Sequence, residues 1–110
     1  MEFDVELSGP EGAVIRVSGR LNMVSAPKLR DLVTHIVHGD GRSHLVVDLA
    51  GTDFVDSSGL GALIAGLKTA RSAGGDLRIA RAGTQVTMVL ELTGLDRILQ
   101  SHDSVEECFQ

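Results

Sequence analysis

The sequence predicts a single α/β domain over residues 1–110, with a mixed, mostly parallel β-sheet packed by about four α-helices. The length suits one hydrophobic core and leaves no room for a second. Residues of the hydrophobic class make up 43% of the chain and are almost all aliphatic, since there are three Phe and no Trp or Tyr. Strand and helix periodicities follow one another in the order β β α β α β α β α. This order implies parallel strands joined by right-handed crossovers.

The first two predicted strands form an antiparallel hairpin. Residues 2–7 alternate between apolar and acidic, as expected of a half-buried strand. A turn rich in glycine and proline at 8–12 leads to a second strand at 13–18, which should pair with the first. The face expected to be buried on the first strand comprises Phe3, Val5 and Leu7.

The first predicted helix follows the segment GRLN at 19–22. Ser25 is expected to cap it, and Pro27 lies in its first turn, where proline is well tolerated. The segment HGDG at 38–41 ends it. Its apolar stripe consists of Leu29, Leu32, Val33, Ile36 and Val37.

The middle of the chain predicts a strand, a helix and a strand. Residues 44–49 are apolar with little alternation, which is typical of a strand covered on both faces. The longest helical pattern runs from 57 to 73, and the next strand is 76–80. The buried face of this helix is expected to contain Leu60, Leu63, Ile64 and Leu67.

The last third predicts a helix, a short strand and a final helical segment. The helix covers 85–93 and closes at Gly94, a favourable residue after a helix. Met88 and Leu92 lie off its apolar stripe and are either exposed contacts or a wider core. Residues 97–100 (RILQ) are a strand candidate, followed by helical residues 103–109. The inward-facing residues there are Val105, Cys108 and Phe109.

Charge and composition exclude several classes of partner and location. The formal net charge is −5, which disfavours binding to nucleic acid or to an anionic membrane. Cys108 is the single cysteine, so no internal disulfide can form. We expect it to pack in the core as a small apolar side chain. No apolar run approaches the length of a membrane span, and the acidic N-terminus does not resemble a signal peptide. We therefore expect a cytoplasmic protein.

No recognisable enzyme or metal motif is present. The nucleophile elbow G-x-S-x-G requires glycine two residues before the serine, but Val55 precedes Ser57 and Asp56 precedes Ser58 at that spacing. No phosphate-binding loop occurs, and the glycines of GLGALIAG fall inside a helix. His35 and His38 lack a third ligand at a recognisable spacing. We expect no cofactor and no metal.

The segment DSS at 56–58 marks the start of the long helix. Asp and Ser at such a position accept hydrogen bonds from the free N–H groups of the first turn, so these residues can be helix caps. One cap needs one side chain, and here three candidates follow one another. A hydroxyl at a helix N-terminus is also a favourable place for a phosphate group, because the helix dipole stabilises an anion there. Such a phosphate would add about −1.5 to −2 charge close to Asp53 and Asp56.

The sequence resembles the anti-sigma factor antagonists, which are small bacterial STAS domains. The segment DFVDSSGLGALI at 53–64 is similar to the family signature. The match extends beyond this stretch, since four segments resemble those of the family in order: 14–33, 44–61, 74–80 and 92–109. The resemblance covers essentially the whole chain and implies a STAS fold.

This resemblance implies a partner-switching role in transcription regulation. The unphosphorylated antagonist would bind an anti-sigma factor, a serine kinase of the GHKL type, and so release a sigma factor. The kinase would phosphorylate Ser57 and end the complex, and a phosphatase would restore the serine. The implied partner-binding residues are Asn22, Asp53, Asp56, Ser57, Ser58, Gly59, Leu60 and Gly61.

One residue departs from the family pattern. The family usually has Asp at the end of the G-x-L-D loop, where this chain has Asn22. Asn keeps the shape but lacks the charge, so the change is either neutral or weakens phosphorylation. Two other functions stay open at this point: a STAS module in another signalling scaffold, such as a stressosome-like assembly, and a small α/β hydrolase that uses Ser57 or Ser58.

Overall fold

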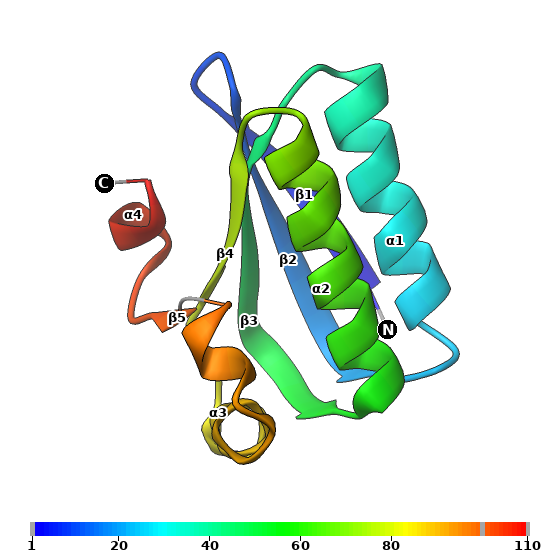
Figure 1. The fold of residues 1–110 in the computed structure, drawn as a ribbon, viewed down its shortest axis with the longest axis vertical. Coiled ribbons are helices and arrows are strands. Elements are labelled where there is room, and N and C mark those ends of the chain that lie inside the picture. Colours follow the sequence, from blue (N-terminus) through cyan, green and yellow to red (C-terminus); the bar gives the residue numbers. More distant parts are fainter. Residues whose placement is uncertain (1, 100, 110) are drawn as a thin grey trace.

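The fold is a five-stranded sheet with strand order β1-β2-β3-β4-β5, as seen in a computed structural model that describes residues 2–99 and 101–109 (Figure 1). β1 and β2 are antiparallel, whereas β2, β3, β4 and β5 run parallel to one another. The predicted mixed, mostly parallel sheet is therefore confirmed. The strands are β1 (Glu2–Ser8), β2 (Gly12–Leu21), β3 (His44–Val55), β4 (Asp76–Ala80) and β5 (Ser101–His102).

In the described residues, four α-helices pack around the sheet. They are α1 (Ala26–Thr34), α2 (Ser57–Ser72), α3 (Thr84–Thr93) and α4 (Val105–Cys108). α1 continues into a π-helical turn (His35–Gly39), and α3 is followed by a 3-10 turn (Leu95–Arg97). α1 and α2 lie side by side over one face of the sheet, α4 lies against the other, and α3 sits beyond the end of β3 (Figure 1). None of the helices in the described part of the chain combines the length and hydropathy needed to cross a bilayer.

The main core lies between the sheet and helices α1 and α2. It is aliphatic, as the composition predicts, and its largest fully buried side chains include Ile15, Leu29, Leu49 and Leu63. Gly66 lets α2 approach closely, because a methyl group there would lie 3.0 Å from the Leu77 side chain and 3.4 Å from that of Val33. The core therefore fixes the height of α2 above the strands.

The opposite face of the sheet has a group of charged side chains as well as a small apolar cluster under α4. Asp48 is 2% exposed and accepts hydrogen bonds from Arg81 and from the backbone N–H of Ala50, and Arg16 lies 3.6 Å away. Burial raises the pKa of Asp48, but these hydrogen bonds and the nearby positive charges outweigh it and leave that pKa below its usual value. Asp48 is thus a structural anion held by two arginines.

The structure corrects the predicted course of β1 and β3. Val5 and Leu7 are 37% and 55% exposed, because β1 is an edge strand that the helices cover only in part, so the predicted burial of its apolar face is wrong there. β3 extends six residues beyond the predicted end at Leu49. After two register shifts its pairing with β2 continues to the pair Val55 and Leu21.

The C-terminal prediction was also wrong in part. Residues 97–99 form helical turns rather than a strand, since Leu99 donates its N–H to Leu95 and is fully buried. Residue 100, also part of that predicted strand, lies outside the described residues. The strand is instead β5, two residues long. Cys108 points inward as predicted, whereas Phe109 is 40% exposed and covers Gly12 with its ring edge.

Candidate functional site

The start of α2 lies at the carboxyl ends of β2 and β3. The chain leaves β3 at Val55, and Asp56 immediately donates its backbone N–H to the carbonyl of Leu21 at the end of β2, over 3.2 Å. Gly59 packs against the same carbonyl, because a methyl group on Gly59 would lie 2.3 Å from the Leu21 oxygen. The two strand ends and the first turn of α2 are therefore joined tightly.

Asp56 caps α2. Its backbone is extended and its carboxylate accepts a hydrogen bond from the N–H of Gly59 over 2.9 Å. Ser57 is exposed and Ser58 is half-buried. Neither hydroxyl makes a hydrogen bond to any residue that the structure describes. Of the three candidates for the cap, the aspartate takes that role and both hydroxyls stay free.

The structure brings the sequence-predicted site residues together at this end of the sheet but gives them different surroundings. Gly59 and Leu60 are buried, and Leu60 belongs to the main core. Their own contacts are internal, and they hold the first turn of α2 in place. Asp53 is exposed and Gly61 is half-buried.

Asn22 shapes the loop between β2 and α1. Its side-chain oxygen accepts hydrogen bonds from the N–H groups of Val24 and Ser25, over 3.0 and 3.3 Å. The predicted cap, Ser25, makes no side-chain capping bond. It is 3% exposed, donates its hydroxyl to the carbonyl of Arg20 over 2.8 Å and accepts from the N–H of Asn22 over 3.0 Å. Ser25 thus occupies the N-cap position as predicted, but its side chain makes no capping bond, and Asn22, three residues earlier, accepts from the N–H groups of the turn instead.

α3 is fastened to the same place by Gln85. The side-chain oxygen of Gln85 accepts a hydrogen bond from the N–H of Val55 over 2.9 Å, and the side-chain NH₂ group donates one to the carbonyl of Val55 over 3.1 Å. The sequence reading missed this residue, since a glutamine at a helix start gives no signal of what it contacts. Gln85 holds the residue that directly precedes the Asp56 cap.

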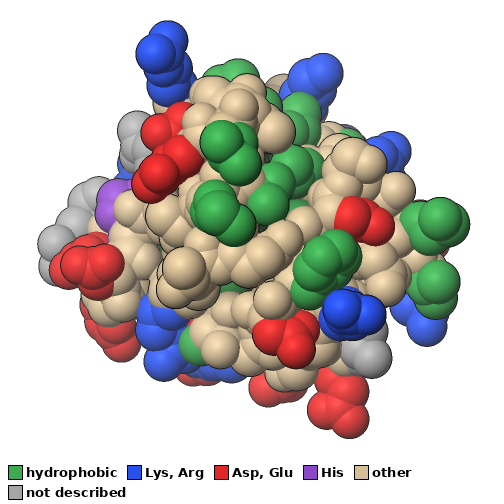
Figure 2. All heavy atoms as spheres, turned by 90° about the horizontal axis from the view of Figure 1, so that it is seen from below, with side chains coloured by type: hydrophobic (Ala, Val, Ile, Leu, Met, Phe, Trp, Pro, Cys, Tyr) green, Lys and Arg blue, Asp and Glu red, His purple; other side chains and the backbone are tan. Residues whose placement is uncertain are grey.

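Exposed hydrophobic side chains lie in the loop before α1 and on α3, on either side of the start of α2 (Figure 1). Met23 and Val24 lie in the loop before α1 and are 72% and 73% exposed. Met88 and Leu92 lie on α3 and are 51% and 79% exposed, so they are surface residues rather than a wider core. Figure 2 looks at this end of the molecule and shows hydrophobic side chains distributed across it, among single acidic and basic ones.

A groove of about 490 Å³ opens beside Ser57 along the outer face of α2. It is lined by Arg30, Ser57, Leu60, Gly61, Ile64, Ala65, Lys68 and Leu95. Two of these, Arg30 and Lys68, are basic residues that the sequence reading did not single out. The helix pattern places Arg30 on the polar side of α1, but it does not reveal that this side borders α2.

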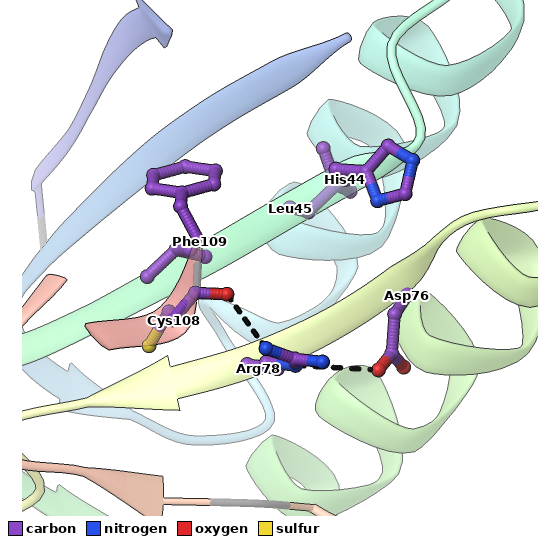
Figure 3. Close-up of a pocket in the computed structure, with 7 residues that line it drawn as sticks. His44, Leu45, Asp76, Arg78, Cys108 and Phe109 are labelled. Carbon is purple, nitrogen blue, oxygen red and sulfur yellow. Dashed lines mark hydrogen bonds and ion pairs between the residues drawn. The ribbon is translucent and has the colours of Figure 1, made fainter. Parts of the chain in front are cut away.

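A second cavity of about 210 Å³ lies at the opposite ends of β3 and β4, under α4 (Figure 3). Arg78 donates to the carbonyl of Cys108 over 2.9 Å and forms an ion pair with Asp76 over 3.4 Å. Burial raises the pKa of the Cys108 thiol.

Across residues 2–99 and 101–109, His, Cys, Asp and Glu form no group of three that could hold a metal. Of the two histidines considered for a metal, His35 has its Nε2 atom 3.9 Å from a carboxylate oxygen of Asp40.

The family follows from a comparison of the whole chain with known protein families. The sequence pattern of the STAS domain matches residues 4–108. The chain belongs to the STAS domain family. Within this family, the antagonists of anti-sigma factors are similar to it in both sequence and structure.

Three STAS proteins illustrate the similarity. The anti-sigma F factor antagonist of Paenibacillus polymyxa is 26% identical over 105 residues, which cover 94% of this chain and 90% of the relative. An anti-sigma factor antagonist from Mycobacterium paratuberculosis has a TM-score of 0.84 at 28% identity, with 98% of this chain and 90% of that chain covered. SpoIIAA, an anti-sigma factor antagonist solved in unphosphorylated and phosphorylated forms, shares the fold with TM-scores of 0.76 and 0.77 at 19% identity. The alignments cover 96% and 98% of this chain and 92% and 96% of SpoIIAA.

Proposed function

We propose that this STAS domain is an anti-sigma factor antagonist whose binding is controlled by phosphorylation of Ser57. The observation that carries the proposal is the exposed Ser57 hydroxyl, which makes no hydrogen bond to a described residue at a helix start that Asp56 already caps. The hydroxyl is therefore accessible to a kinase and unnecessary for the cap. The names of the relatives support the antagonist role.

The physical basis of the switch is the charge that a phosphate group would bring. A phosphate on Ser57 would sit at the N-terminus of α2, where free N–H groups and the helix dipole favour an anion by about 0.3–1 kcal/mol. The fold would accept it, and SpoIIAA, a protein of this fold solved in both forms, supports that view. In a complex the same charge would have to lose its water, which costs several kcal/mol when no partner charge is present.

The proposed docking face combines the serines with the apolar residues around them. Met23 and Val24 on one side and Met88 and Leu92 on the other are exposed, and Ser57 lies at the start of the helix between them. An anti-sigma factor bound there would bury hydrophobic area and would cover Ser57. Phosphorylation would then oppose binding directly, without a change of fold.

The proposed partner is an anti-sigma factor of the GHKL kinase type, which supplies the ATP and the catalytic groups. A phosphatase would remove the phosphate, and the cycle would run in the cytoplasm, where sigma factors act. This chain would then be a binding protein. A hydrolase function finds less support, because no described base is hydrogen-bonded to Ser57 or Ser58.

The test is binding of the purified chain to each GHKL-type kinase of its own organism, with intact mass measured after ATP is added. We expect tight binding of the wild type and one phosphate group that is absent in Ser57→Ala. Ser57→Asp should weaken binding by about 100-fold or more, which corresponds to two units of ~1.4 kcal/mol. Ser58→Asp is the matched control, with the same charge one residue later on a half-buried side chain, and it should still be phosphorylated. Absence of binding to every such kinase would refute the proposal.

Asn22 decides between a switch and a permanent antagonist. An Asp at this position could accept the same two hydrogen bonds from Val24 and Ser25, so Asn22→Asp should preserve the turn. If the wild type binds the kinase but gains no phosphate, and Asn22→Asp gains one, the missing charge explains the loss of switching. Equal phosphorylation of both chains would show that the substitution is neutral.

A further inference from the structure

Arg30 reaches across from α1 to α2. A methyl group built on Gly61 would lie 3.1 Å from a terminal nitrogen of the Arg30 guanidinium, so the cation rests directly over this glycine. The guanidinium makes no hydrogen bond or ion pair with any residue that the structure describes. The hydroxyl of Thr34, on the next turn, donates to the backbone carbonyl of Arg30 and so leaves the guanidinium unengaged. Arg30 therefore contributes a positive charge to the groove beside Ser57, and no described side chain pairs with this charge.

This cation lies one helical turn from the Ser57 side chain. Residues 57 and 61 are four apart on α2, so they are neighbours on the same face; the Cβ positions of such a pair lie about 5–6 Å apart, and the one at Gly61 is empty. Ser57, Gly61 and Arg30 also line the same groove of about 490 Å³. The second cation of the groove, Lys68, is eleven residues beyond Ser57, or roughly 16 Å along the helix axis. Of the two cations that line the groove, Arg30 is thus the one that a group on Ser57 would meet first.

The carboxylates close to Ser57 form no ion pair with Arg30. Asp56 turns its side chain to the N–H of Gly59. Asp53 is exposed at the end of β3 and makes no ion pair with a described residue. Both would repel a phosphate on Ser57, so an anion added there gains most by approaching the guanidinium.

We propose that Arg30 is the internal partner of the phosphate group on Ser57. The inference rests on the proposed function, because it concerns the modified form of the same serine. A guanidinium presents its N–H donors in a planar fork that fits two phosphate oxygens, and such pairs are among the strong hydrogen bonds of proteins. The pair would tie the start of α2 to α1 and would offset the repulsion from Asp53 and Asp56. Gly61 has a role in this arrangement, since its missing side chain leaves the space that the guanidinium occupies.

The experiment places phosphoserine at position 57 during translation and so needs no kinase. The second ionisation of the phosphate, ordinarily near pKa ~6, is followed by ³¹P NMR as a function of pH. A nearby cation favours the dianion and lowers this pKa, and its removal raises it. We expect Arg30→Gln to raise the phosphoserine pKa by about 1 unit, and Arg30→Lys to restore part of the difference. The shift should shrink in 1 M salt to the extent that the pair is exposed.

Lys68→Gln is the matched control, because it removes the same charge from the far end of the same groove. It should leave the phosphoserine pKa within about 0.2 units of the wild-type value at moderate salt. Equal pKa values in the wild type and Arg30→Gln would overturn the proposal, and so would equal shifts from Arg30→Gln and Lys68→Gln. Since the phosphate is installed directly, a kinase that fails to modify Ser57 would count against the proposed function and leave this result unaffected.

Discussion

α1 and α2 both begin where a parallel strand ends, but their polar side chains are used differently. At α1, the side chains of Asn22 and Ser25 are both occupied by hydrogen bonds within the turn. At α2, Asp56 alone makes the cap, and the hydroxyls of Ser57 and Ser58 make no hydrogen bond to a described residue. At the start of α1, the polar side chains thus serve to stabilise the turn itself. The start of α2 has polar groups available for another molecule.

The largest expected effect comes from the contact between α2 and the end of β2. A side chain at Gly59 would collide with the Leu21 carbonyl at 2.3 Å, so Gly59→Ala should lower the free energy of unfolding by about 3 kcal/mol. Gly61→Ala is the control on the same helix, where the new methyl group meets only the flexible end of Arg30. It should be neutral or stabilising by up to ~1 kcal/mol. Urea denaturation of both variants measures the difference, and equal stability would contradict the close packing described for Gly59.

At the start of α1, Ser25→Ala should lower the free energy of unfolding by about 2 kcal/mol. The substitution removes two hydrogen bonds of a buried hydroxyl, each worth about 1 kcal/mol. Ser72→Ala is the matched control, since the Ser72 hydroxyl donates one hydrogen bond to Thr69 at the exposed end of α2. It should change stability by less than about 0.5 kcal/mol. If the two variants unfold at the same urea concentration, the turn at α1 does not depend on Ser25.

At the start of α2, Asp56→Ala should lower the free energy of unfolding by about 1 kcal/mol, the usual effect of losing a helix cap. Asp56→Asn should restore most of the loss because the amide oxygen can accept the same bond from Gly59. Asp53→Ala, three residues earlier on an exposed side chain, should have almost no effect. Thermal unfolding followed by circular dichroism measures all three, and a neutral Asp56→Ala would assign the cap to another side chain.

The smallest effect is expected for the serines themselves. Ser57→Ala and Ser58→Ala should each change the free energy of unfolding by less than about 0.5 kcal/mol, because neither hydroxyl is hydrogen-bonded to a described residue. This result would sharpen the comparison, since Ser25→Ala removes the same atom at the other helix start. A loss of 1 kcal/mol or more at Ser57 would mean that its hydroxyl has a structural role after all.

The sequence predicted the elements of this domain better than their contacts. The order of strands and helices and the buried stripes of α1 and α2 follow from apolar periodicity, which reports what faces the core. The cap at α2 was predicted as one of three side chains, and the structure selects Asp56. At α1, Ser25 takes the predicted cap position, but the hydrogen bonds to the N–H groups of the turn come from Asn22, because both residue types favour such turns and only the path of the loop distinguishes them.

The contacts that shape the site were harder to predict because they join distant parts of the chain. Arg30 and Gln85 lie 27 residues before and 28 residues after Ser57. Each has an unremarkable position in its own helix, and each matters because of the neighbouring element. Gly61 held a weak signal, since a glycine in a helix interior lowers helix stability and calls for a reason such as close approach. The identity of the approaching side chain required the packed structure.

The paired hydrogen bonds between Gln85 and Val55 have a consequence for the speed of recognition. The amide group of Gln85 occupies the N–H and carbonyl of the last strand residue, while the Leu21 carbonyl holds the N–H of Asp56 next to it. The backbone that carries Ser57 is therefore fixed on both sides before any partner arrives. A surface prepared in this way loses little conformational entropy on docking. Its association rate should be set by diffusion and orientation, with no slow rearrangement to wait for.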